Sequence, residues 1–398
     1  MTDSCPVCQG AGCAEVFTAP RPLPVFCNAL LPSEAEATSA PRAPIRLLVC
    51  TTCSHVWNAD FNEQAVAYDP GYENSLHFSG TFSAFAEHLA RRLVDDHGLT
   101  GRSVVEIGSG KGDFLALLLG AGVGTATGYD PSYNGERDDA LANSRVRVIP
   151  DVFPTDPGSL TADLVCARHV LEHVSRPPKL LGPLATAVGN TGTVLYAEVP
   201  DGGYLLRTTA VWDVIYEHPH HFTAPSMHRL LDDAGFGVIR LDTAFADQYL
   251  WAEGRAESPS TVPAPTDEVA RLLALAESFA RAAERLVLYW AEQLATYRIE
   301  GRSVALWGAG SKGVTFLNLV PGGETVDVVV DINPRKHARH LPGTGQEVIA
   351  PAELAAVAPD VVLVMNPVYE AEIAARLDDL GVVAEAVVVD SAAVAGSV

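Results

Sequence analysis

Apolar and polar residues follow two different periods along the chain, one typical of helices and the other of strands. Residues 78–96 (FSGTFSAFAEHLARRLVDD) repeat apolar side chains at helical spacing, which predicts a helix. Short β-branched runs and helical segments then alternate: SVVEIG, GTATGYD, ADLVCA and TGTVLYAEV are typical of strands, and DFLALLLGAG of a helix. Strands that alternate with helices pair in parallel, so this region predicts an α/β domain with helices on both faces of its sheet.

The same alternation starts again in the last third of the chain. Residues 268–297 predict a long amphipathic helix, and SVALWG, TVDVVVDI, DVVLVMN and VAEAVVVD predict further strands. Residues 254–267 (GRAESPSTVPAPTD) are rich in Pro and Ser and predict a linker. The first part of the chain has little periodicity. These shifts predict three units: a small module over 1–70 and two α/β units over 71–255 and 256–398.

The composition is that of a folded protein, because 48% of the 398 residues are apolar and only 19% are charged. The 27 Lys and Arg against 49 Asp and Glu leave a formal net charge of −22, which repels polyanions and argues against a nucleic-acid partner. No apolar run reaches the roughly 18 residues of a membrane-spanning helix. The start, MTDSCPVC, has no export signal. We therefore expect a soluble, cytoplasmic protein without a membrane partner.

Four of the seven cysteines form two Cys-x-x-Cys pairs, Cys5 with Cys8 and Cys50 with Cys53. Each pair can present two thiolates to one ion, and two pairs complete the tetrahedral S4 shell that suits Zn²⁺. A redox pair would be expected at a helix start in a thioredoxin-like unit, and no such unit is indicated here. We expect a structural zinc site, with a shell that uses Cys13, Cys27 or His55 as the alternative. A closed S4 site supports folding and has no open position for a reaction.

A glycine-rich turn follows the first strand of the middle unit, in the run VVEIGSGKGD. Glycines let the backbone approach a ligand that a Cβ atom would exclude. Asp130 ends the next strand about 20 residues later, where a carboxylate can accept both hydroxyls of a ribose. Asp151 and Phe153 follow another apolar segment, where they could accept from an adenine amine and cover its ring. Three such features in this order indicate a nucleotide-type cofactor.

The motifs EIGSGKG, GYD, DVF and ADLVCARHVLEHV together resemble the class I S-adenosylmethionine-dependent methyltransferases. The resemblance implies a Rossmann-like fold for this unit and S-adenosylmethionine as its cofactor. The residues that it assigns to the cofactor are Glu106, Gly108, Ser109, Gly110, Gly112, Asp130, Pro131, Asp151, Val152, Phe153, Arg168 and His169.

The segment from His169 to His173 also spells HxxEH, the pattern of one class of zinc-protease helices. We reject this interpretation, because the segment directly follows a strand and a third metal ligand is not evident. The methyltransferase class commonly has a turn of this type at this place. His169 is then expected to border the cofactor, and His173 to face the reaction cleft or to support packing.

Residues 212–223 (WDVIYEHPHHFT) place a Tyr, a Glu and three His within six positions. We interpret this density as too polar for a packed strand, because unpaired buried imidazoles are costly. Imidazole and carboxylate are the usual general bases near neutral pH, and a phenol can donate to an oxyanion. The alternative is a solvated His-rich loop.

The last unit carries WGAGSKG, DINPRK, LPG and PDVVLVMN in that order. This series resembles the C-terminal domain of the sugar C-methyltransferases of deoxysugar and antibiotic biosynthesis. Members of that family carry a zinc module, a methyltransferase domain and a degenerate Rossmann-like domain. The resemblance covers almost the whole chain, and it implies an α/β protein with a zinc module, a class I methyltransferase domain and a second Rossmann-like domain.

In that family a Tyr-His-Glu-His segment supplies the base, whereas here Tyr216-Glu217-His218 is one residue shorter and is followed by Pro219-His220-His221. The base is therefore left open among Glu217, His218 and His220, with His218 as the first choice. The stretch around Tyr68 and Tyr72 only approximates the family's Tyr/Ser-rich segment. The candidate catalytic residues are His218, Glu217, Tyr216, His173, His220, His221 and Tyr72.

Residues 308–313 form a GxGxxG loop after a strand, with Asp331 about 20 residues further on, which by itself indicates a dinucleotide site. The resemblance implies a fold without NAD. Lys312 and Lys336 are then expected to be partners of a substrate diphosphate.

We expect methyl transfer to a carbon next to a ketone, through an enolate, on a nucleotide-linked sugar or a related small molecule. The first alternative is transfer to oxygen or nitrogen of another natural-product intermediate. The second is a scaffold protein or an NAD enzyme. The sequence indicates neither the acceptor nor whether the chain is a monomer or a homodimer.

Overall fold

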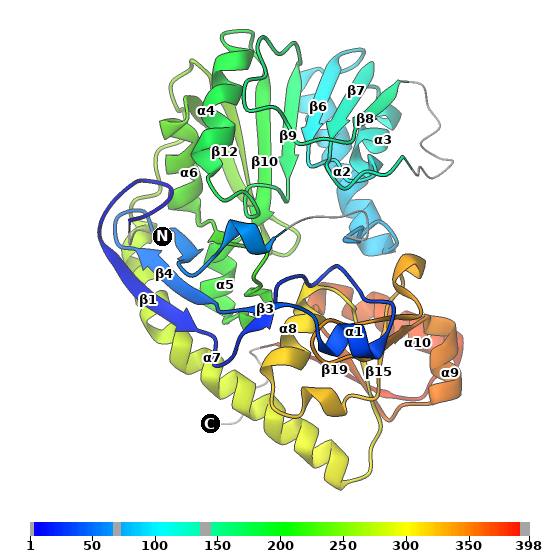
Figure 1. Cartoon of the computed structure of the whole chain (residues 1–398). Helices are drawn as coiled ribbons and strands as arrows, with labels where there is room; N and C mark the ends of the chain where they lie inside the picture. The colour runs from blue at the N-terminus through cyan, green and yellow to red at the C-terminus, as the bar shows by residue number, and fades with distance from the viewer. Residues whose placement is uncertain (1–3, 67–72, 136–144, 391–398) are drawn as a thin grey trace.

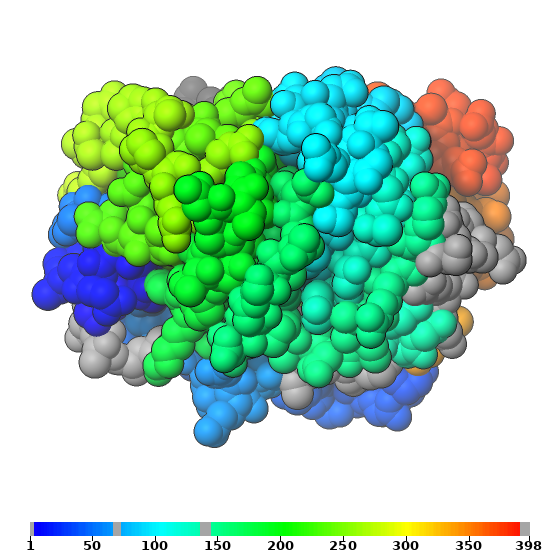
Figure 2. Space-filling model, turned by 90° about the horizontal axis from the view of Figure 1, so that it is seen from above, coloured from blue at the N-terminus to red at the C-terminus, as the bar shows by residue number. Residues whose placement is uncertain are grey.

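The computed structural model describes residues 4–66, 73–135 and 145–390. It contains two α/β bodies, with the N-terminal segment along one side and the long helix α7 (Glu268–Ile299) crossing below (Figure 1). In the view from above, the body made by the middle of the chain covers most of the face, and the two ends of the chain show only at its margins (Figure 2).

The upper body is built on a sheet whose described residues form seven strands in the order β12-β13-β10-β9-β6-β7-β8. The strands from β10 to β8 pair in parallel, and β13 runs antiparallel between β10 and β12. All five residues of β9 are buried, because helices cover both faces of the sheet. The strands are β6 (Ser103–Ile107), β7 (Thr125–Tyr129), β8 (Val146–Ile149), β9 (Leu164–Arg168), β10 (Val194–Pro200), β12 (Phe236–Ala244) and β13 (Tyr249–Ala256). The helices of this part are α2 (Gly80–His97), α3 (Asp113–Gly120), α4 (Pro177–Val188), α5 (Gly202–Thr208) and α6 (Ala224–Asp233). The predicted α/β fold with a mostly parallel, Rossmann-like sheet is confirmed.

The lower body is a second Rossmann-like sheet, in the order β16-β17-β15-β14-β18-β19 over the residues described. All its pairings are parallel except that of β16 with β17. The strands are β14 (Val304–Trp307), β15 (Val328–Val330), β16 (Arg339–His340), β17 (Glu347–Ile349), β18 (Val361–Val364) and β19 (Glu385–Val388). The helices are α8 (Ser311–Leu319), α9 (Leu354–Val357) and α10 (Glu370–Leu380).

The N-terminal segment forms an antiparallel sheet in the order β1-β4-β5-β11. Its last strand, β11 (His220–His221), comes from the middle of the chain, and both of its residues are buried. The expectation that the His-rich segment is too polar for a packed strand is therefore wrong. The other elements here are β1 (Cys13–Thr18), β2 (Leu23–Pro24), α1 (Glu34–Thr38), β3 (Arg42–Ala43), β4 (Arg46–Cys50) and β5 (Val56–Asn58).

Helix α7 packs one face against the rest of the protein. Its buried residues, which recur at intervals of three and four, are Leu272, Ala276, Phe279, Ala283, Leu286, Trp290, Leu294 and Tyr297. They share one hydrophobic core with residues of the N-terminal sheet and of the lower body. Among the described residues, no helix is both long enough and apolar enough to span a membrane.

The Pro/Ser-rich stretch after the upper sheet is bound to that sheet, which differs from the prediction of a linker over 254–267. Its first residues complete β13. Further on, Ser260 Oγ accepts from the amide of Val238 at 2.9 Å, and the amide of Thr261 donates to the Val238 carbonyl at 2.8 Å. A high content of Pro and Ser cannot distinguish a segment bound to a sheet edge from a flexible linker, because neither kind of segment has a regular hydrophobic period.

Candidate active site

A cavity of about 1370 Å³ lies where the carboxyl ends of the two parallel sheets face each other. The loops after β6, β7 and β9 line it from the upper body, and those after β14, β15 and β18 line it from the lower body. Ligands of open α/β sheets bind at such carboxyl ends, so this cavity is the candidate active site.

The glycine-rich loop after β6 forms one wall. Gly108 has a φ of 69°, and a Cβ atom there would lie 2.4 Å from Cγ2 of Val170. The positive φ and the close packing of the loop against Val170 therefore both require glycine at position 108. Asp130 holds the loop, since its Oδ2 accepts from the Gly110 amide at 2.7 Å. Its Oδ1 accepts from the amide and the hydroxyl of Ser132, at 2.9 and 2.6 Å.

Most residues that the sequence assigned to the cofactor line this cavity. They are Glu106, Gly108, Ser109, Gly110, Asp130, Pro131, Val152, Phe153, Arg168 and His169. Gly112 and Asp151 are not among the lining residues. Gly112 is the buried N-cap of α3, and the exposed Asp151 uses its Oδ1 to accept from the Val152 amide at 2.8 Å.

A buried charged network lies behind the cofactor wall. Arg168 donates to Glu198 through Nε at 3.0 Å, and its Cζ stacks 4.1 Å from the centre of the Phe114 ring. His169 lies 3.4 Å from both Glu172 and Glu198. Burial alone would lower the pKa of His169, but the two nearby carboxylates outweigh it and raise the pKa to about 9. His169 is therefore charged at neutral pH.

Glu106 is the carboxylate of the glycine motif, and its residue is only 3% exposed. Burial raises its pKa to about 8, and the nearby Arg168 offsets only part of this effect. The group is therefore largely protonated at neutral pH. A bound cation would favour its ionised form.

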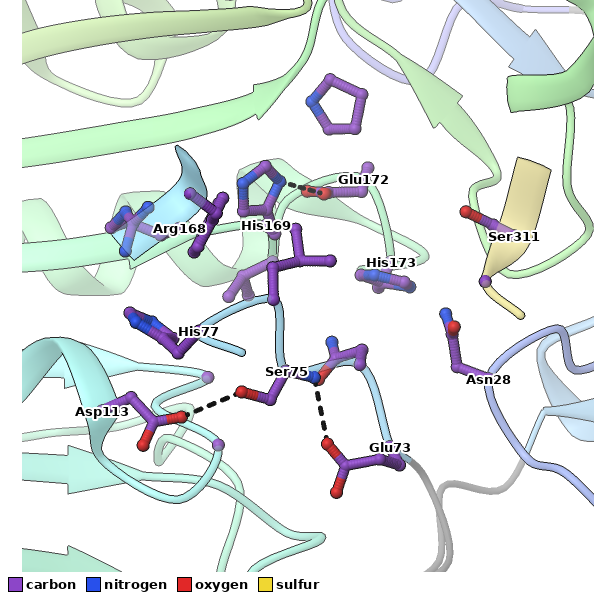
Figure 3. A pocket seen from close by; sticks show the side chains of 18 of the residues that line it. Asn28, Glu73, Ser75, His77, Asp113, Arg168, His169, Glu172, His173 and Ser311 are labelled. Atoms are coloured by element: carbon purple, nitrogen blue, oxygen red, sulfur yellow. Dashed lines mark hydrogen bonds and ion pairs between the residues drawn. The ribbon is translucent and has the colours of Figure 1, made fainter. Parts of the chain in front are cut away.

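His173 and His218 lie together on the cavity wall, with ring centroids 4.6 Å apart and planes at 82°. Nδ1 of His173 is 2.9 Å from the Glu217 carbonyl, which can only accept, so Nδ1 carries the proton and Nε2 is the basic nitrogen. Burial lowers the pKa of both rings, and both are neutral at pH 7. In Figure 3, His173 lies between His169 and Ser311 of the opposite body.

The four other candidate residues of the His-rich segment, Tyr216, Glu217, His220 and His221, do not line the cavity. Tyr216 is 1% exposed, and its Oη accepts from the Asn62 amide at 2.8 Å. Glu217 is fully buried, and its Oε2 accepts from the Cys27 amide at 2.7 Å. His220 and His221 lie in β11, and burial lowers the pKa of each to about 4. Of the five residues of this segment that were expected to face the acceptor, His218 is the one that lines the cavity. The candidate residue Tyr72 lies outside the described residues.

The two Cys-x-x-Cys pairs come together away from the cavity. Sγ of Cys5 is 3.7 Å from that of Cys53, and Sγ of Cys8 is 3.5 Å from that of Cys50. All four sulfurs lie within 4.8 Å of one another. Zinc–thiolate bonds of about 2.3 Å in a tetrahedron place sulfurs about 3.8 Å apart, so the donor set and its spacing fit Zn²⁺.

The GxGxxG loop of the lower body faces the same cavity, but its charged residues are paired within the protein. Asp331 accepts from the Ala309 amide at 2.9 Å. Lys336 is 5% exposed and donates to the Ala309 carbonyl at 3.0 Å. Lys312 forms an ion pair with Asp213. Both lysines line the cavity and are already paired within the protein, and their expected role as partners of a substrate diphosphate stays a prediction.

One wall residue that sequence reasoning missed is Glu73. It lies 3.1 Å from Lys111 of the glycine loop and 3.5 Å from Arg335 of the lower body, and it accepts from Asn333 at 3.1 Å. These hydrogen bonds and charges lower its pKa even though burial opposes the shift. Residues 74–79 join Glu73 in lining the cavity, and the Ser75 hydroxyl donates to the Asp113 carboxylate (Figure 3). In the sequence this segment only approximated the family's Tyr/Ser-rich segment, and the bonds of Glu73 could not be predicted because its partners come from distant parts of the chain.

Comparisons with known proteins find two family matches and a number of similar solved structures. Residues 81–241 match a family described as a methyltransferase domain, and residues 266–388 match the C-methyltransferase C-terminal domain. A search of curated proteins finds no match. Similar solved structures include the 1,6-didemethyltoxoflavin-N1-methyltransferase of Burkholderia thailandensis, with 18% identity over 44% of this chain and 79% of that one and a TM-score of 0.35. Another is the magnesium protoporphyrin IX methyltransferase of Synechocystis PCC 6803, with 16% identity over 44% and 84% and a TM-score of 0.35.

The two family matches fall on the two α/β bodies that face each other across the cavity. The chain is therefore an S-adenosylmethionine-dependent methyltransferase that carries the C-terminal domain of the C-methyltransferases.

Proposed function

We propose that this protein methylates a carbon next to a ketone in a small natural-product intermediate, for which a nucleotide-linked deoxysugar is the first candidate. The observation that carries the proposal is the pair of neutral imidazoles, His173 and His218, in a cavity closed by a C-methyltransferase domain. A carbon next to a ketone becomes nucleophilic only as an enolate, and a neutral imidazole is a suitable base for forming it.

The cofactor side of the cavity is proposed to be the loop around Gly108 and Gly110, with Asp130 at its end. When bound, S-adenosylmethionine supplies an electrophilic methyl group on a sulfonium. Asp130 is partly exposed, and hydrogen bonds from the amides of Gly110 and Ser132 already orient its two carboxylate oxygens. These oxygens can therefore accept from ribose hydroxyls. The ionisable Glu106 near this loop can balance the positive charge of the ligand.

His218 is the proposed base, because among the candidate bases Glu217, His218 and His220 it is the one that lines the cavity. His173 is its neighbour, and its proton on Nδ1 is committed to the Glu217 carbonyl. Its Nε2 can accept a proton from His218 or hold a polar group of the acceptor. Glu217 contributes its backbone carbonyl to this arrangement, rather than its carboxylate, which is bound to Cys27.

We also propose that Cys5, Cys8, Cys50 and Cys53 hold one structural Zn²⁺, on the basis of their sulfur spacing. The three proposed units, over 1–70, 71–255 and 256–398, are supported by the three main sheets, although β11 joins the first to the second. The cytoplasm is the proposed location, and a monomer or homodimer the proposed state.

Deuterium exchange tests the function. With a keto substrate, S-adenosylhomocysteine and heavy water, the wild-type protein should wash deuterium into the α-carbon, and His218→Gln should lose this exchange by about 10²–10⁴-fold. His228→Gln is the matched control, because His228 is a buried histidine outside the cavity lining. Methylation without any exchange in the wild type would instead favour the alternative, transfer to oxygen or nitrogen.

A further inference from the structure

The residues next to His218 belong to the sheet of the cysteine module. In β11, His220 pairs with Trp57 and His221 with Val56 of β5. The Asn58 amide donates to the Pro219 carbonyl at 2.9 Å, which extends this pairing to the residue beside His218. His218 therefore projects from the end of an edge strand whose neighbour is an N-terminal strand.

Side chains on both sides of His218 are also held by N-terminal residues. The bonds are those of Tyr216 Oη with the Asn62 amide (2.8 Å), Glu217 Oε2 with the Cys27 amide (2.7 Å), His220 Nδ1 with His55 Nε2 (3.0 Å) and Thr223 Oγ1 with Ser54 Oγ (2.8 Å). His218 lines the cavity, whereas none of these four residues does. The N-terminal segment thus anchors the residues around His218 and leaves its ring to the cavity.

His220 contacts both the cysteine module and the cavity wall. Its Nε2 lies 3.4 Å from the carbonyl of Ser175, a residue of the wall two positions after His173. A carbonyl can only accept, so His220 carries its proton on Nε2 and accepts through Nδ1 from His55 Nε2. His55 directly follows the Cys50–Cys53 pair and Ser54. One neutral imidazole therefore joins the metal-binding loop to the turn that carries His173.

We propose that His220 is a positioning residue, which holds the turn of His173 and the strand of His218 in register with the cysteine module through its bonds to Ser175 and His55. The proposal rests on the proposed function, in which the His173–His218 pair acts on the acceptor. It gives the N-terminal module a part in catalysis beyond folding. It also assigns a role to the histidine at position 220, which sequence reasoning had counted among the candidate bases.

The test uses the full-length, zinc-loaded protein with S-adenosylhomocysteine bound and its histidines labelled with ¹⁵N. Ring signals of His173 and His218 are assigned with His173→Gln and His218→Gln. His220→Phe removes both bonds while keeping a flat ring of similar size. We expect it to shift or broaden the ring signals of His173 and His218, while the affinity for S-adenosylhomocysteine by calorimetry stays unchanged.

His228→Phe is the matched control, because His228 is 5% exposed and its Nε2 lies 2.9 Å from the Val262 carbonyl, outside the cavity lining. It should leave the His173 and His218 signals in place. Unmoved signals in His220→Phe, or an equal displacement in His228→Phe, would overturn the proposal.

If His220→Phe does not fold, His220→Gln serves in its place, since its amide can still donate to Ser175 but does not reproduce the ring nitrogen facing His55. It should displace the two signals, and unchanged signals would again overturn the proposal. These spectra need no acceptor. If the ¹⁵N spectra are as expected but the wild-type protein exchanges no deuterium into the keto substrate, the proposed chemistry is rejected and the positioning role of His220 stands.

Discussion

Replacing Asp130 by Asn tests which of the two glycine loops holds the cofactor. The carboxylate of Asp130 accepts three hydrogen bonds, one from the Gly110 amide and two from Ser132. Asn keeps one oxygen and turns the other position into a donor, which would face the backbone N–H of Gly110 or of Ser132 unfavourably. One hydrogen bond to a charged group contributes about 1.5–3 kcal/mol, so the affinity should fall roughly 10- to 150-fold. The partial exposure of Asp130 favours the lower half of this range.

Calorimetry with S-adenosylhomocysteine measures this change without turnover. Asp331→Asn is the matched control, because Asp331 accepts from the Ala309 amide at 2.9 Å in the second loop, as Asp130 does in the first. This variant should bind the ligand as the wild type does, and NAD should give no binding heat. An unchanged affinity in Asp130→Asn, or an equal loss in Asp331→Asn, would refute the assignment of the first loop.

Two further predictions concern zinc and pH. Elemental analysis should find about one zinc per chain, and Cys50→Ser should lower both the zinc content and the yield of soluble protein, because an S4 site contributes to folding; metal-free, folded wild-type protein would contradict this. Glu172 and Glu198 raise the pKa of His169 from 6.5 to about 9, against the effect of burial. The charged ring therefore stabilises the folded protein fully below pH 6.5, and this stabilisation is lost as the pH rises through 9. Urea unfolding should therefore show the advantage of the wild type over His169→Gln shrinking between pH 6.5 and 9.5, and a constant difference would argue against these ion pairs.

Elements with a strong local pattern could be predicted from the sequence. The helix expected over 78–96 corresponds to α2, at Gly80–His97, and the one expected over 268–297 corresponds to α7, at Glu268–Ile299. The apolar runs of the parallel strands were also recognisable, because strands buried on both faces tolerate few polar residues. The glycine loop and Asp130 were found together because a turn, a close approach and a strand end are all properties of short segments.

The His-rich segment shows where local reasoning stops. The density of Tyr216, Glu217, His218 and His220 suggested an exposed catalytic cluster, since each group is costly to bury without a partner. The partners exist, but they are Asn62, Cys27 and His55, which lie more than a hundred positions away in the chain. Only the tertiary structure could show that three of these four side chains are bound inside the protein and that His218 alone among them faces the cavity.

The sequence by itself determined the two α/β units, the glycine loop with its carboxylate, and the two cysteine pairs, because each depends on residues within one short stretch. The tertiary structure decided what joins those parts. It placed β11 in the N-terminal sheet, set Glu73 between Lys111 and Arg335, and paired Lys312 with Asp213. Which polar groups are satisfied, and which remain available to a ligand, depends on contacts between distant segments. A single sequence does not record those contacts, and they form only when the chain folds.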